Sequence, residues 1–312
     1  MLIIKLLLAV VITLLFYLRH KVGFKLKIFF HPILLGPALG FLLGPQLLNI
    51  SKGSFSAGVT IGVLVELLWG SNLVDFNAGL QYGLMTSLLS ISLVALTGNL
   101  NLFFPLSLVV LLVYSFQESL GTFSTKKWYI YLVGGFNFLI LLGAPVVKII
   151  LAWIPAEILD NITVAGGLIP AVALGFIFVQ GIFPIFKRDN IWYYSYLIAT
   201  LLTSVLMLNG EVWASLFFPL CWYSIYYLWN QSKDIKFKDY FRISIAVIVV
   251  LIAVLFMDFS SPYVTGNIQY VLWTEALVAL FAVLRFFKLT VIEGYFIMIL
   301  LGIIGSKLGI FI

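Results

Sequence analysis

Glu66 is the residue whose surroundings in the sequence most favour chemistry. It lies in the apolar run GVTIGVLVELLWG, and an ionised carboxylate at the centre of a membrane helix costs about 2.5–3.5 kcal/mol. A polar cavity, a partner or protonation must offset that cost. Because Ser71, Asn72 and Asp75 follow closely, one interpretation is a polar pocket beside Glu66. The other is a carboxylate at the membrane interface, at the end of a short helical hairpin.

Outside this region the sequence offers little that could catalyse a reaction. A second polar cluster, which is either a site or an ordinary loop, consists of Ser115, Gln117, Glu118 and Ser119. The histidines are His20 and His31, and the single cysteine is Cys221. None of these residues forms an H-x-x-x-H, Cys–His, G-x-S-x-G or P-loop pattern. We therefore expect no metal, no other cofactor and no catalytic residue in this chain.

Glycines recur every four residues in two apolar segments. They are Gly36, Gly40 and Gly44 in the first segment and Gly58 and Gly62 in the second. On a helix this spacing leaves a groove on one face, where another backbone can approach closely. The glycines therefore predict close helix packing. Pro37 and Pro45 lie in the first segment and favour a broken or kinked helix there.

The composition places the elements that carry these residues in a membrane. Of 312 residues, 63% are hydrophobic and 10% charged, against about 25% charged in a typical soluble domain. This excludes a soluble domain and predicts an all-α, polytopic transmembrane helix bundle in contact with lipid. The net charge of +6 does not indicate nucleic-acid binding, because the basic residues lie in short loops between apolar runs.

Apolar segments near the length of a membrane crossing recur along the whole chain. We predict about 10–12 of them: Leu2–Leu18, Ile33–Leu48, Phe55–Trp69, Gly79–Leu96, Leu102–Ser115, Lys127–Trp153, Val164–Phe186, Ile191–Leu208, Val212–Trp229, Ile243–Met257, Tyr270–Leu284 and Val291–Ile312. The third and fifth are short, so either could be a re-entrant hairpin buried in protein. Basic residues follow the first segment instead of preceding it, which favours a retained span over a cleaved signal peptide.

Loop charges give an orientation. If every segment crosses once, one side receives the basic clusters, at Arg19–Lys27, Lys126–Lys127, Lys187–Arg188, Lys233–Arg242 and Arg285–Lys288. The other side receives the acidic loops, at Glu157–Asp160, Glu211 and Asp258. Basic loops face the cytoplasm in membrane proteins. We therefore expect both termini on the outer side.

Two stretches resemble a known family, the IIC membrane subunits of mannose-family (mannose, fructose and sorbose) phosphotransferase system (PTS) sugar transporters. HPILLGPALGFLLG followed by GVTIGVLVELLWG is similar to the family's RP-x(3)-GPLVGLILGD and GIIIGATLELIxLG, with Glu66 at the family's glutamate. Ile154–Phe178, IPAEILDNITVAGGLIPAVALGFIF, is similar to IPxxLxNGLxVAGGMLPAVGFAMLL. The positions in register there are Asn161, Ala165, Gly166, Gly167, Pro170 and Ala171.

The resemblance covers about residues 1–229 and implies a domain organisation. Residues 1–229 would form an IIC-like transmembrane domain, residues 230–242 a polar cytoplasmic linker, and residues 243–312 a C-terminal extension of three spans. The last segment is loosely similar to the final span of the companion IID subunits. Differences from the family pattern are His31-Pro32 in place of Arg-Pro, a missing aspartate after the glycines, the longer stretch Pro45–Ala57, and no proline-aspartate step near Phe76–Gln81.

The resemblance also implies a function. The chain would be the membrane subunit of a mannose-type permease in the bacterial cytoplasmic (inner) membrane, forming the path of a hexose-like sugar together with IID. Soluble IIA and IIB proteins would carry the phosphate, so this chain would at most be the non-phosphorylated component of a sugar phosphotransferase complex. Glu66, Asn72 and Asn161 would bind the sugar, and Gly166 and Gly167 would serve helix packing. A homo-oligomer is compatible with this arrangement.

Two other functions stay open. The altered Arg-Pro and aspartate positions favour a membrane scaffold or regulator, which would dock soluble PTS proteins at the basic loops without moving sugar. A membrane enzyme acting on lipid-linked sugars is the weakest alternative, because the sequence shows no acidic dyad and no metal motif. Sugar-dependent phosphotransfer in vesicles separates the permease from the scaffold.

Overall fold

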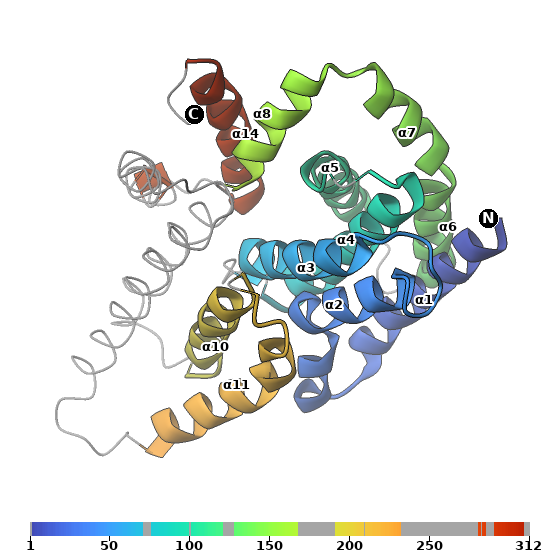
Figure 1. Ribbon diagram of the computed structural model, residues 1–312. Helices are drawn as coiled ribbons and strands as arrows, with labels where there is room; N and C mark the ends of the chain where they lie inside the picture. The colour runs from blue at the N-terminus through green and yellow to red at the C-terminus, as the bar shows by residue number, and fades with distance from the viewer. Residues whose placement is uncertain are drawn as a thin grey trace. The chain divides into compact units, whose positions relative to one another are not determined.

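The computed structural model of the chain describes residues 2–70, 76–99, 101–120, 128–167, 191–208, 210–231, 280–281, 283–284 and 290–308. Within these ranges the regular secondary structure is helical (Figure 1), which confirms the predicted all-α class. The chain divides into two compact units, Met1–Val65 with Asn77–Thr163 and Glu66–Phe76 with Val164–Ile312. Four predicted segments lie mostly or wholly outside the described residues: the linker 230–242 and the spans Val164–Phe186, Ile243–Met257 and Tyr270–Leu284.

The first unit carries most of the described helices. They are α1 (Leu2–Lys21), the 3₁₀ helix η1 (Phe24–Phe30), α2 (Pro32–Leu43), α3 (Ser54–Gly70), α4 (Phe76–Thr97), α5 (Phe103–Leu120), α6 (Tyr129–Leu142), α7 (Ala144–Trp153) and α8 (Ala156–Gly167). The ends of α3 (from Glu66) and α8 (from Val164) and the first residue of α4 belong to the second unit. The second unit also contains α10 (Ile191–Leu208), α11 (Ala214–Gln231) and α14 (Val291–Lys307).

Helix lengths bear directly on membrane crossing. Two described helices, α1 and α5, are long and apolar enough to cross a membrane, and α6 with α7 makes a third if this pair, bent by 41°, is one span. The bend falls at Gly143, just before Pro145. Some other apolar helices are shorter, among them α2 with 12 residues. At 1.5 Å per residue α2 reaches about 18 Å, well short of a hydrocarbon core of about 30 Å.

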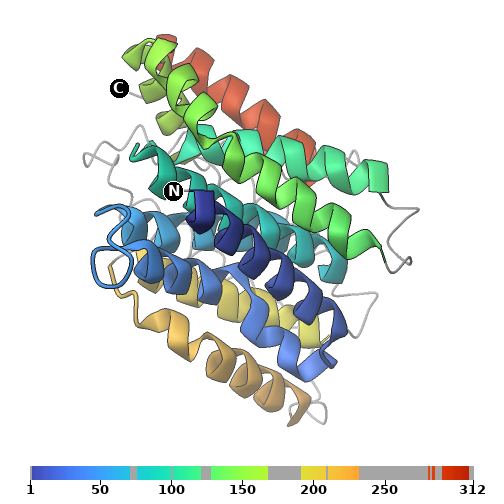
Figure 2. The ribbon, with the colours of Figure 1, turned by 90° about the vertical axis from the view of Figure 1, so that its right-hand side faces the viewer.

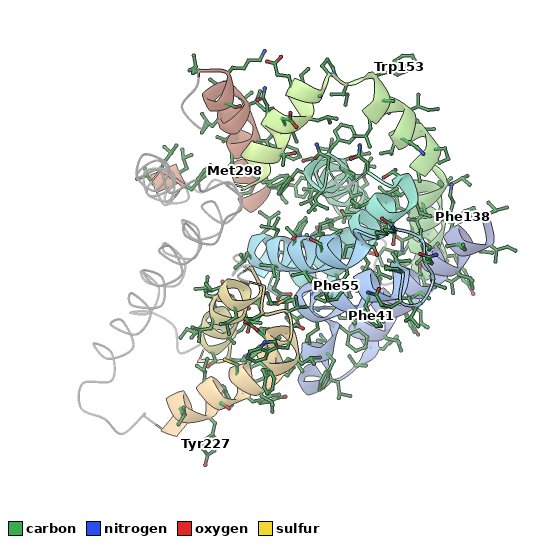
Figure 3. The ribbon with its side chains drawn as sticks, viewed as in Figure 1. Phe41, Phe55, Phe138, Trp153, Tyr227 and Met298 are labelled. Carbon is green, nitrogen blue, oxygen red and sulfur yellow. The ribbon has the colours of Figure 1, made fainter. Side chains whose placement is uncertain are left out.

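Many large apolar side chains of these helices are exposed, and two basic side chains are buried. Ile3 is 73% exposed and Trp153, which points away from α7 in Figure 3, is 83% exposed. Lys5 and Arg19, by contrast, are buried although both are basic. The Arg19 guanidinium donates to the carbonyl of Phe30 over 2.6 Å, at the end of η1. Such burial is unusual for a soluble protein, in which charged residues are almost never fully buried unless they are paired.

Buried polar groups join α1 to α6, which lie side by side and antiparallel (Figure 2). Asn137 Nδ2 donates to Thr13 Oγ1 over 3.0 Å, and Thr13 in turn donates to the carbonyl of Ala9 over 2.6 Å. Near the start of α1, Lys5 Nζ lies 3.4 Å from the carbonyl of Leu142, the last residue of α6. A cation at the C-terminal end of a helix is favourable, because it meets the negative end of the helix dipole.

We expect Thr13→Val to destabilise this interface by about 1 kcal/mol, since interhelical hydrogen bonds in membranes average roughly 0.6 and reach about 1.7 kcal/mol. The change leaves the buried Asn137 amide without its Thr13 acceptor. In a Thr13→Val/Asn137→Leu double variant, the amide is gone and the loss should be smaller than the sum of the two single losses. Thermal unfolding of all four proteins in one detergent measures the coupling. Strictly additive effects would show that the two side chains do not stabilise each other.

Candidate functional site

Glu66 lies near the end of α3, and this end of α3 contacts two tyrosines of α10 within the second unit. Its carboxylate is fully buried, and Tyr196 donates its hydroxyl hydrogen to Glu66 Oε1. One turn earlier on α10, the Tyr193 hydroxyl donates to the carbonyl of Gly70 over 3.2 Å. Position 66 therefore pairs with 196 and position 70 with 193, so this end of α3 runs antiparallel to α10.

Gly70 makes room for Tyr196. A Cβ atom at position 70 would lie 3.0 Å from Tyr196 Cζ and closer still to its hydroxyl oxygen. Any side chain there would push the phenol away from Glu66. The glycine that ends GVTIGVLVELLWG thus has a steric role in the site, beyond ending the helix.

An aromatic cluster fixes the Tyr196 ring from its other side. Ring centroids lie 4.9 Å apart between Tyr196 and Trp222, and 6.2 Å apart between Tyr196 and Phe218. Trp222 also packs on Trp192 with centroids 4.6 Å apart, and its indole Nε1 donates to the carbonyl of Trp192 over 3.1 Å. These contacts make α10 and α11 an antiparallel pair (Figure 1). The chain between them passes through Gly210, whose φ of 96° suits glycine.

The arrangement can recognise hydrogen-bond donors. A carboxylate is an acceptor-only group with about four lone-pair positions, and the Tyr196 hydroxyl engages one oxygen. Bonds to an ionised carboxylate are about twice as strong as bonds between neutral groups. Burial among aromatic rings keeps bulk water away and strengthens each such bond. In the described part of the chain, no group of three or more His, Cys, Asp or Glu side chains is placed to hold a metal ion.

The other two predicted sugar-binding residues are Asn72 and Asn161. Asn72 lies outside the described residues. Asn161 is buried in α8 and belongs to the first unit. Beside it in sequence, Thr163 Oγ1 donates to Asn101 Oδ1 over 3.1 Å, and Asn101 Nδ2 donates to the carbonyl of Leu159 over 3.2 Å. This network fastens α8 to the segment before α5.

The two glycine stripes lie against each other and pair α2 with α3. A Cβ atom on Gly36 would lie 2.6 Å from the carbonyl oxygen of Gly58, and one on Gly40 would lie 2.5 Å from that of Ser54. One on Gly62 would lie 2.7 Å from the carbonyl oxygen of Pro32. The first stripe thus runs antiparallel to the second. Near the end of α2 and the start of α3, the rings of Phe41 and Phe55 pack edge to face, with their centroids 6.3 Å apart (Figure 3).

The remaining predicted packing glycines have other surroundings. Gly44 is the C-cap of α2, and a Cβ there would meet the Gln46 side chain and carbonyls of its own helix. Gly166 and Gly167 are the last two residues of α8, and their contacts lie outside what is described. The predicted segment Ile33–Leu48 is helical through Pro37, and its helix, α2, ends at Leu43, before Pro45.

The second polar cluster is helical, so the loop interpretation of it is wrong. Helix α5 continues to Leu120 and includes all four cluster residues. Ser119 Oγ donates to the carbonyl of Ser115 over 2.8 Å, one turn back. A serine that bonds to its own helix in this way needs no loop to satisfy its hydroxyl. With 18 residues α5 is also longer than the predicted fifth segment, Leu102–Ser115, and long enough to cross a membrane.

Comparison with known proteins returned no match: no protein-family model, curated protein or solved structure matches the chain.

Proposed function

We propose that this chain is a multi-pass protein of the bacterial cytoplasmic membrane and the membrane subunit of a mannose-type PTS permease for a hexose-like sugar. The observation that carries the proposal is the buried Glu66 carboxylate, held by the Tyr196 hydroxyl. It occupies the position at which the sequence resembles the family's glutamate. A buried ionisable group at membrane depth is costly and marks a functional site in most membrane proteins.

The distribution of side chains supports the membrane location. The exposed face of α1 is apolar, with Ile3, Leu7, Val10 and Leu14 each at least half exposed. Exposing this apolar surface to water would be unfavourable, whereas contact with lipid tails is not. We propose the orientation given by the loop charges, with Lys187–Asn190 and Asn230–Arg242 cytoplasmic and Glu157–Asp160 outside. The antiparallel pair α1–α6 agrees with helices that alternate in direction across a bilayer.

In the proposed function Glu66 accepts hydrogen bonds from sugar hydroxyls, and Tyr196 holds the carboxylate in place. A neighbouring IID subunit completes the path. The soluble IIA and IIB proteins pass phosphate to the incoming sugar, so no residue of this chain becomes phosphorylated. Asn72 and Asn161 remain proposed sugar contacts.

Transport coupled to phosphorylation tests the proposal. Membrane vesicles that contain the full chain and IID, supplied with the soluble PTS proteins and phosphoenolpyruvate, should accumulate phosphorylated hexose from a panel of labelled D-mannose, D-fructose and D-glucose. A phosphocarrier without its phosphorylatable histidine is the control and should abolish accumulation. Vesicles that form no sugar phosphate with any of the three sugars, yet retain the soluble IIA or IIB protein, would contradict transport and favour the scaffold.

A further inference from the structure

Several described serine and threonine side chains in these helices satisfy their hydroxyls in the same local way. The hydroxyl donates to a backbone carbonyl one turn earlier in the same helix. Thr13 donates to Ala9 over 2.6 Å, Ser92 to Leu88 over 2.7 Å and Thr97 to Leu93 over 2.8 Å. This back-bonding needs no partner from another helix and suits buried hydroxyls in an apolar environment.

Four buried hydroxyls in the described part of the chain make no such bond and no other hydrogen bond. They are Thr86 and Ser90 on α4 and Thr200 and Ser204 on α10. In each helix the two residues are four positions apart, so they lie on one face, about 6 Å apart along the axis. Burying a hydroxyl without a partner is unfavourable, and alanine or valine would avoid the cost. Two such pairs therefore suggest a use for the hydroxyls other than packing.

The α10 pair continues the Glu66 site. Tyr193, Tyr196, Thr200 and Ser204 follow one another at intervals of three, four and four residues, which places them on one stripe of the helix. We call this set the hydroxyl stripe of α10. Its first two members bond to the end of α3. The Thr200 hydroxyl lies beside the Tyr196 phenol, close enough for a weak contact between the two hydroxyls, but not in the geometry of a hydrogen bond.

We propose that Thr200 and Ser204 are ligand-binding residues that extend the Glu66 site along α10 and hydrogen-bond to hydroxyls of the transported solute. The proposal rests on the proposed sugar function and adds the residues that select among polyhydroxylated solutes. Thr200 is 2% exposed and Ser204 is fully buried. A hydroxyl is both donor and acceptor, so each can bind a sugar hydroxyl of either orientation, whereas Glu66 when ionised binds donors only.

Binding of labelled D-mannose, D-fructose and D-glucose to the full chain in lipid nanodiscs tests this. Thr200→Val and Ser204→Ala should each weaken binding of the preferred hexose about three- to tenfold, the loss expected for one hydrogen bond between neutral groups. Thr200→Ser should retain binding. Thr200→Val and Ser204→Ala should also raise the melting temperature of the sugar-free protein, because each removes a buried hydroxyl that lacks a partner. Ser92→Ala, which removes an equally buried hydroxyl bonded to its own helix, should leave binding unchanged.

A monodeoxy series of the preferred hexose sharpens the test. The analogue that lacks the contacted hydroxyl should bind wild-type and Thr200→Val protein equally well. If wild-type protein binds a hexose and both variants bind it with unchanged affinity, the two hydroxyls are structural and the inference is wrong while the permease proposal stands. If wild-type protein binds none of the three hexoses, the proposed function fails, and the assignment of these hydroxyls to sugar fails with it.

Discussion

Glu66→Gln is expected to leave the protein inserted and folded but to lower sugar uptake at least about tenfold. Glutamine keeps the shape of the side chain and an oxygen that accepts from Tyr196, which is the bond that the structure shows. It loses the charge, and hydrogen bonds to a charged group contribute roughly 1.5–3 kcal/mol against about 1 kcal/mol for neutral pairs. Because about 1.4 kcal/mol corresponds to a factor of ten, losing the charge at one or two sugar hydroxyls produces a loss of this size.

The thermal stability of the Glu66→Gln protein should rise or stay unchanged, although its sugar uptake falls. An ionised carboxylate costs about 2.5–3.5 kcal/mol at a helix centre, and glutamine removes that charge. Glu66→Ala behaves differently, because it also removes the acceptor of the Tyr196 hydroxyl. Leaving a buried donor without its acceptor costs about 1–3 kcal/mol, so the alanine variant should lose both uptake and thermal stability.

Uptake kinetics and melting temperature, measured on equal amounts of inserted protein, separate these effects. Glu157→Gln is the matched control, since Glu157 is an exposed carboxylate at the start of α8, and it should transport as wild type does. Tyr196→Phe should reduce uptake less than Glu66→Gln, because it leaves the charge in place and removes only the group that positions it. Wild-type kinetics in a well-expressed Glu66→Gln protein would remove Glu66 from the sugar site.

Glu66 could be singled out from sequence as a candidate because its signal is local. A charge among thirteen mostly apolar residues is visible without any knowledge of the fold. Tyr196 could not be predicted, because 130 residues separate it from Glu66 and tyrosines are frequent in this chain. The aromatic cluster around Trp222 was missed for the same reason. Trp192 and Trp222 are separated by 30 residues, and aromatic residues in a membrane helix ordinarily indicate an interface or packing.

The glycine stripes were predictable because a period of four has one structural meaning on a helix. The sequence did not show which helix each stripe contacts. In the structure the first stripe packs on the second. The error at Ser115–Ser119 has a physical cause too. A loop was one of two interpretations of these polar residues at the end of an apolar run. A helix satisfies its own backbone, however, and the bond from Ser119 to Ser115 satisfies this hydroxyl. Helix ends are set by backbone geometry and capping, which composition alone does not reveal.

Gly58→Ala is expected to be the most damaging single-methyl change in the first unit. A Cβ atom at position 58 would lie 2.5 Å from the carbonyl oxygen of Gly36 and 2.9 Å from Gly40 Cα. Both atoms belong to backbone, so no flexible side chain can move aside, and α2 must shift away from α3. The shift would also weaken the bond from Ser54 Oγ to the carbonyl of Gly40, which spans 2.9 Å.

Overpacking of this kind costs about 1–3 kcal/mol, so the melting temperature in detergent should fall by several degrees, and Gly58→Leu should prevent folding. Gly135→Ala is the matched control. Gly135 lies inside α6 with nothing within 4 Å of a Cβ, and alanine is a better helix former than glycine by up to about 1 kcal/mol. That variant should be as stable as wild type or more so. A Gly58→Ala protein that melts at the wild-type temperature would show that α2 and α3 do not approach closely at this glycine in the membrane protein.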